Sequence, residues 1–142
     1  MLIRFSVENC FSFLERATFS MIPGLGRLKK EHINARKHGV TTLKTAIAFG
    51  ANASGKSNLV KAIALGKQMV VNGTLNGSKV TYAPYRLSKD AVIRNTRLEY
   101  EIQAGRKNYA YGFVFNDERI VEEWLYEITN KEEKMLFERS DT

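Results

Sequence analysis

The chain has 142 residues, of which 44% are hydrophobic and 11% aromatic, a length and composition that fit one folded domain and argue against disorder. Its longest apolar runs span only a few residues, which excludes a membrane-spanning helix, and its alternating N-terminus does not resemble a signal peptide. Cys10 is the only cysteine, which excludes internal disulfides and cysteine-clustered metal sites, so we expect a cytoplasmic protein with no membrane partner.

Basic residues are concentrated in the first half of the chain. The net charge is +7; residues 1–71 hold 11 Lys and Arg against 3 Glu, whereas residues 72–142 hold 11 Lys and Arg against 12 Asp and Glu. Much of the excess lies in one stretch, which contains Arg27, Lys29, Lys30, His32, Arg36, Lys37 and His38. Two interpretations fit: the 27–37 loop contacts nucleic acid, or it is a solvated loop beside a polyphosphate site.

The first 22 residues are expected to form a β-hairpin. Apolar side chains alternate with polar ones in residues 2–8 and again in residues 17–21, the period-two pattern of half-buried strands. Residues 10–16 would join the two strands, and the Pro-Gly-Leu-Gly segment that starts at Pro23 ends the second one. Residues 23–44 are mostly polar and basic and predict a loop with at most one irregular helical turn.

Residues 45–72 combine a predicted strand, a glycine-rich loop and a helix. Thr45–Phe49 is a short apolar run, which predicts a buried strand. The next eight residues match the phosphate-binding pattern G-x-x-x-x-G-K-[ST] at every fixed position, as Gly50, Ala51, Asn52, Ala53, Ser54, Gly55, Lys56 and Ser57. A helix follows with one apolar stripe, formed by Leu59, Ala62, Ile63, Gly66, Met69 and Val70. In this order, successive N–H groups and the helix dipole can converge on one anion.

The glycine-rich loop predicts a nucleotide site with a role for each residue. Lys56 would reach the β- and γ-phosphates, and the Ser57 hydroxyl would bind Mg²⁺. The backbone of residues 50–58, which ends at Asn58, would cradle the phosphates. The expected ligands are ATP or GTP with Mg²⁺. Lys56 stabilises charge but is no base, and no motif supplies a general base unless a carboxylate such as Glu122 or Glu123 reaches the site.

The last third of the chain predicts an antiparallel β-meander. Residues 73–95 form a connection that begins with the turn signals Asn72-Gly73 and Asn76-Gly77. Within 96–142, four segments alternate apolar and polar side chains at about ten-residue spacing, the pattern of short antiparallel strands. Their turns are expected at Gly105, Asn116-Asp117 and Asn130-Lys131. The apolar side of these strands needs a partner surface, most simply the N-terminal strands.

Several segments resemble the N-terminal half of an ABC-type ATPase head. They are Leu2–Phe13, Ala46–Asn58 with its phosphate loop, Tyr109–Phe113 and Glu123–Arg139. The resemblance is to RecF-, SMC- and OLD-like bacterial ATPases, and within them to AAA-type ATP/GTP-binding proteins of phage-defence and abortive-infection systems. It implies an α/β fold, a P-loop NTPase core fragment with an antiparallel β-meander, in which residues 1–142 form the N-terminal lobe of the head.

The resemblance also implies how such a protein works. ABC-type heads hydrolyse ATP between two protomers, so it implies a homodimer, an effector partner and a role in DNA-related or antiviral defence. Here Cys10 and Phe11 stand where the family has the Phe and Arg of an Asn-Phe-Arg-Ser-Phe segment. No Asp-Glu strand, signature motif or switch histidine follows the phosphate loop. We therefore expect this chain to bind nucleotide, with hydrolysis depending on a C-terminal half.

Three other interpretations remain open. The chain could be a complete small regulatory protein that binds nucleotide without hydrolysis, a P-loop kinase, or a nucleic-acid-binding module with an incidental glycine loop. A kinase would need an Arg-rich lid, and no Arg-clustered helix follows the phosphate loop. Asn130–Glu133 lacks the Asp of a guanine-reading motif and predicts a turn. Cys10 is expected to be a small buried hydrophobe rather than a nucleophile.

Overall fold

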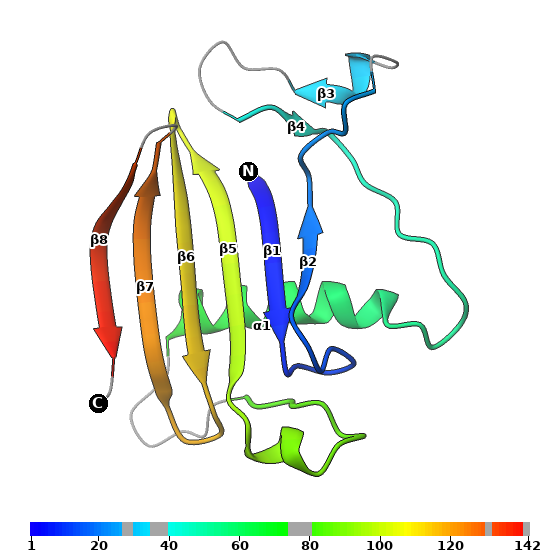
Figure 1. Cartoon of the computed structure of the whole chain (residues 1–142), viewed down its shortest axis with the longest axis vertical. Coiled ribbons are helices and arrows are strands. Elements are labelled where there is room, and N and C mark those ends of the chain that lie inside the picture. The colour runs from blue at the N-terminus through cyan, green and yellow to red at the C-terminus, as the bar shows by residue number, and fades with distance from the viewer. Residues whose placement is uncertain (27–29, 35–39, 74–80, 130–131, 141–142) are drawn as a thin grey trace.

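The computed structural model describes residues 1–26, 30–34, 40–73, 81–129 and 132–140. Six strands form one sheet in the order β2-β1-β5-β6-β7-β8, and every neighbouring pair is antiparallel (Figure 1). The strands are β1 (Leu2–Glu8), β2 (Ala17–Ser20), β5 (Thr96–Ala104), β6 (Lys107–Phe115), β7 (Ile120–Ile128) and β8 (Glu133–Ser140). The predicted N-terminal hairpin and the four strands of the meander are thus confirmed.

The core lies between one face of this sheet and α1 (Lys56–Asn72), the one α-helix of the described residues, which crosses behind the strands (Figure 1). Strand alternation in β1 turns Ile3, Phe5 and Val7 inward, with exposures of 2, 0 and 1%. The sheet and α1 extend this apolar cluster with Leu98, Phe113, Phe115, Ala62 and Leu65. Burying one large apolar side chain stabilises a fold by about 1.5–3 kcal/mol, so this contact between sheet and helix holds the molecule together.

Most of the apolar stripe predicted for α1 faces the core. Leu59, Ala62, Ile63, Gly66 and Met69 are buried or pack against the cluster, whereas Val70 is 52% exposed and Leu65, outside the predicted stripe, is buried. Gly66 is needed because a Cβ at this position would overlap the Tyr100 hydroxyl, which donates to the Ile63 carbonyl at 3.0 Å. The glycine therefore lets α1 approach β5 closely.

The strand predicted over Thr45–Phe49 is wrong. Residues 45–50 take part in no strand pairing within the described part of the chain, and Ile47 and Phe49 are 77 and 88% exposed. A buried strand needs hydrogen-bonded neighbours along its edges and apolar cover on its faces. The segment instead leaves β4 and runs outside the sheet to the start of α1 (Figure 1), so the described elements do not supply the burial that its apolar composition predicted.

Two other expectations are corrected. The described residues of the 23–44 region include the 3₁₀ turn η1 (Lys30–His32), but also a short ladder of β3 (Ile33–Asn34) with β4 (Thr42–Leu43), which the polar composition did not predict. The N-terminal strands do not cover the apolar face of the meander. Instead, β1 hydrogen-bonds to β5 edge to edge and α1 covers the face, because the α1 stripe is the apolar surface that complements the inward side of the strands.

Some of the remaining predictions concern described residues, and others lie outside them. Gly105 adopts a φ of +62° between β5 and β6, as expected for the predicted turn. The Asn76-Gly77 and Asn130-Lys131 turns lie outside the described residues, as do most of the basic residues of the 27–37 loop. Cys10 is fully buried, and burial raises the pKa of its thiol to about 12, which agrees with an inert core residue.

Within the described residues, the structure contains no helix with the length and apolar character that crossing a bilayer requires. The 3₁₀ turn η2 (Asp90–Ile93) ends the long connection between α1 and β5. Residues 81–95 of this connection and the turn after β1 both lie toward the N-terminal end of α1 (Figure 1). They therefore place additional side chains beside the glycine-rich loop.

Candidate nucleotide site

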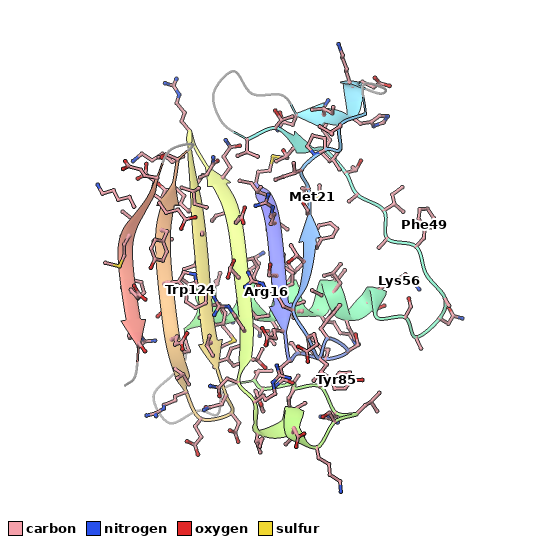
Figure 2. The ribbon with its side chains drawn as sticks, viewed as in Figure 1. Arg16, Met21, Phe49, Lys56, Tyr85 and Trp124 are labelled. Carbon is pink, nitrogen blue, oxygen red and sulfur yellow. The ribbon has the colours of Figure 1, made fainter. Side chains whose placement is uncertain are left out.

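The glycine-rich loop leads directly into α1, whose first residue is Lys56 (Figure 2). Ala53 and Gly55 have positive φ values of 63 and 94°, a conformation that glycine adopts at little cost. A Cβ at Gly50 would lie 2.6 Å from the Ser54 Oγ. The loop curls back on itself, so that Gly55 supplies a left-handed conformation and Gly50 lies against the Ser54 side chain.

The loop presents unpaired backbone donors at the helix N-terminus. The Gly55 carbonyl accepts hydrogen bonds from the N–H groups of Asn58 and Leu59, at 2.9 and 3.0 Å. Among the described residues, the N–H groups of Gly55, Lys56 and Ser57 have no such partner, as is usual for the first turn of a helix. Unpaired N–H groups at the positive end of a helix dipole form a site suited to an anion.

The Lys56 ammonium lies folded over the same loop. Its Nζ donates to the carbonyls of Gly50 and Ala51, at 2.7 and 2.6 Å, and lies 3.3 Å from the Ser54 Oγ. Phosphate oxygens are acceptors of the same kind and carry negative charge, so they can replace these neutral partners with stronger, charge-assisted hydrogen bonds. The structure thus places the predicted phosphate-binding cation inside the loop.

Ser57 fits the predicted metal role. Its side chain is exposed in the first turn of α1, and its hydroxyl has no hydrogen-bond partner among the described residues. Mg²⁺ prefers oxygen ligands and usually takes one or two from the protein while sharing others with substrate phosphates. The Ser57 hydroxyl together with a triphosphate in the loop would provide that kind of ligand set.

The turn after β1, which contains Phe11 and Ser12, lies against the glycine-rich loop beside Gly55 and forms a second wall of the candidate site. The Ser12 hydroxyl lies so close to the loop that a Cβ at Gly55 would come within 2.8 Å of it. The Phe11 N–H donates to the Ala83 carbonyl at 2.7 Å, which ties the turn to the connection after α1. Phe11, Ser12, Asn58 and residues 83–87 line a cavity of about 320 Å³.

Asn9 holds this second wall in place. It is fully buried with a φ of +48°, a left-handed conformation that Asn tolerates better than most residues. Its amide nitrogen donates to the carbonyls of Ala91 and Arg94, at 2.7 and 2.6 Å, and its Oδ1 accepts the Tyr85 N–H at 3.2 Å. Sequence reasoning missed this wall, since the only signal was the bias of the residue before Pro84 toward an extended conformation.

A larger cavity of about 630 Å³ lies between the C-terminal half of α1 and strands β5–β8. Glu123 lines it, where it accepts a hydrogen bond from the Tyr111 hydroxyl at 2.5 Å and pairs with Arg139 at 3.0 Å. Burial, followed by the hydrogen bond to Glu123, raises the pKa of Tyr111 well above its ordinary value. Glu123 is therefore engaged at the far end of α1 and does not serve the phosphate loop.

Comparison with known proteins agrees with this geometry. A family described as "AAA domain, putative AbiEii toxin, Type IV TA system" matches residues 49–142, a range that contains the whole phosphate loop, α1 and the meander. None of the curated proteins matches the chain. The AAA domain is a P-loop NTPase domain, so a nucleotide-binding, ATPase-like function follows from the match. Because the match extends over more than half of the chain, and as the sequence predicted, this protein belongs to the AAA-domain family of the abortive-infection type.

Proposed function

We propose that residues 50–58 bind the triphosphate of ATP or GTP together with Mg²⁺, and that the chain is the nucleotide-binding lobe of an ABC-type ATPase in antiviral or DNA-related defence. The observation that carries the proposal is the position of Lys56, whose ammonium lies on the loop carbonyls of Gly50 and Ala51. The N–H groups of Gly55 and Ser57 beside it are free for an anion within the described structure.

The proposed roles follow from the chemistry of each group. The loop N–H groups and Lys56 would neutralise phosphate oxygens, and Ser57 would hold Mg²⁺, which would neutralise further negative charge on the triphosphate. Orienting the attacking water requires a further group. The meander carboxylate Glu123 is committed to Tyr111 and Arg139. We therefore propose that hydrolysis depends on residues from a C-terminal half and on a dimer of heads.

Partners other than nucleotide belong to the same proposal. In the basic stretch, Lys30 and His32 are described, and both are exposed on η1. An exposed Lys side chain on a turn suits contact with a phosphate backbone, so we propose nucleic acid as a partner of the 27–37 loop. With the proposed defence role we also propose an effector protein as a partner and a cytoplasmic location. These assignments rest on the family and on charge, whereas the nucleotide site rests on geometry.

The metal role of Ser57 is tested by the dependence of ATP affinity on magnesium. Removing a hydroxyl ligand leaves the loop N–H groups and Lys56 in place, so Ser57→Ala should retain ATP binding but lose most of the gain in affinity that Mg²⁺ gives to the native chain. Isothermal titration of ATP with and without Mg²⁺ measures this ratio. We expect this ratio to fall by at least roughly tenfold, since even the loss of an outer-shell partner of a metal costs about 10–100-fold in metal affinity.

Ser54→Ala is the matched control for this experiment. Its hydroxyl lies in the same loop, 3.3 Å from the Lys56 Nζ, but is assigned no metal. The ratio of ATP affinities with and without Mg²⁺ should therefore stay near the native value in Ser54→Ala. An unchanged ratio in Ser57→Ala would refute the metal role, and a native chain that binds neither Mg·ATP nor Mg·GTP would refute the proposed function.

A further inference from the structure

The cavity between the turn after β1 and residues 83–87 is built from groups that suit a nucleoside. Its volume of about 320 Å³ lies at the lower end of the range of about 300–1,000 Å³ for small-ligand pockets. Phe11 and Tyr85 contribute aromatic rings, and Asn58 and Arg86 contribute polar groups. Aromatic faces with a few polar groups are the usual means of holding a base in proteins.

The polar groups of this cavity are available to a ligand. Within the described residues, the side chains of Asn58 and Arg86 make no hydrogen bond or ion pair, and the Tyr85 hydroxyl is likewise unpaired. The backbone around them is fixed, since the Tyr85 N–H is bound by the buried Asn9 and the Phe11 N–H by the Ala83 carbonyl. The fixed backbone thus positions these side chains, and their polar groups are free to bind a ligand.

The cavity adjoins the phosphate loop. Asn58 belongs to the first turn of α1, directly after Ser57, and Ser12 lies against Gly55. Tyr85 lies toward the same end of α1 as Lys56 (Figure 2). A nucleoside is joined covalently to its triphosphate, so the nucleoside of any nucleotide held by the loop has to lie within a few bonds of this region.

We propose that this cavity is the nucleoside pocket of the site, with Tyr85 stacking on a purine base. The proposal rests on the nucleotide-binding function proposed above and adds the residues that select the base. A purine is favoured because it offers a larger face for stacking, and because its N7 accepts a hydrogen bond from an Asn or Arg donor. The base edge would thus meet Asn58 or Arg86, the two unpaired side chains of the cavity.

The test compares a ligand that has a base with one that has none. Titration calorimetry would measure the affinity of the whole chain for Mg·ATP, Mg·GTP, Mg·CTP and inorganic tripolyphosphate. Loss of a stacked aromatic ring costs about 5- to 150-fold in affinity. Tyr85→Leu should therefore weaken ATP or GTP by that factor, remove the preference over CTP, and leave tripolyphosphate unchanged.

Two variants serve as controls. Tyr85→Phe keeps the aromatic face and should keep purine affinity, whereas Tyr126→Leu removes a tyrosine that hydrogen-bonds Glu138 on β8 and should have no effect on any ligand. The tripolyphosphate affinity reports whether the loop and the fold of each variant are intact. A full purine preference in Tyr85→Leu would overturn the pocket while leaving the proposed function standing. A native chain that binds neither purine nucleotide nor tripolyphosphate would overturn the function itself.

Discussion

Lys56→Ala is expected to weaken Mg·ATP binding by at least about 100-fold while leaving the circular dichroism spectrum of the folded chain unchanged. A hydrogen bond to a charged group is worth about 1.5–3 kcal/mol, and Lys56 would make one to each of two phosphates. Its present partners are the exposed carbonyls of Gly50 and Ala51. Removing the ammonium returns those carbonyls to water, so the stability of the fold should change little. Isothermal titration and circular dichroism measure the two quantities.

Lys61→Ala is the matched control for the loss of charge. Lys61 is exposed on the same helix, five residues after Lys56, and its substitution removes one positive charge from α1 outside the loop. We expect Lys61→Ala to keep native affinity within about twofold, because Lys61 is exposed outside the glycine-rich loop and water and salt weaken the effect of an exposed charge. Equal losses in the two variants would indicate a general electrostatic effect, and native affinity in Lys56→Ala would reject the phosphate-loop assignment.

The second large effect concerns catalysis. We expect the purified chain to bind ATP with at most trace turnover, because water-orienting and charge-stabilising groups outside the phosphate loop are commonly worth about 10³–10⁵ in rate. Lys56 supplies charge but no base, and the Glu123 carboxylate is held by Tyr111 and Arg139 at the far end of α1. Phosphate release measured under saturating Mg·ATP checks this expectation. Joining the chain to a C-terminal half of the head should restore hydrolysis.

The control for turnover is Lys56→Ala, which separates genuine activity from a contaminating ATPase. Activity that survives in Lys56→Ala comes from another protein. Steady multiple turnover by the native chain that disappears in Lys56→Ala would contradict our account, because it would require a general base within these 142 residues. The described carboxylates nearest in sequence to the cavity, such as Asp90, would then become the candidates.

The predictable parts of this structure are those encoded by local patterns. Period-two alternation in residues 2–8, in residues 17–21 and across the last third located all six strands of the main sheet, and the stripe that includes Ala62 and Ile63 identified the face of α1. Such patterns indicate which side of an element is buried, whatever partner the element packs against. The glycine-rich loop was recognisable in the sequence because its glycine pattern reflects a local backbone conformation, in which Gly55 has a positive φ.

The parts that sequence reasoning missed depend on contacts between distant segments. Thr45–Phe49 is apolar, but whether it forms a strand depends on neighbours that its own residues do not specify. The wall made by Phe11, Ser12 and Tyr85 is assembled by Asn9, whose side chain spans from residue 9 to residues 85, 91 and 94. A single buried Asn has no periodicity and resembles any turn residue, so no local pattern predicts it.

The measurement that tests the central claim most directly is an amide chemical-shift titration of the ¹⁵N-labelled chain with Mg·ATP. The N–H groups of Gly55, Lys56 and Ser57 are unpaired in the described structure and would become donors to phosphate. We therefore predict that these three amides move downfield in a saturable manner, with the strongest shifts of any residue. Saturable binding with the largest shifts confined to other elements, such as strands β5–β8, would contradict the assignment of residues 50–58 as the nucleotide site.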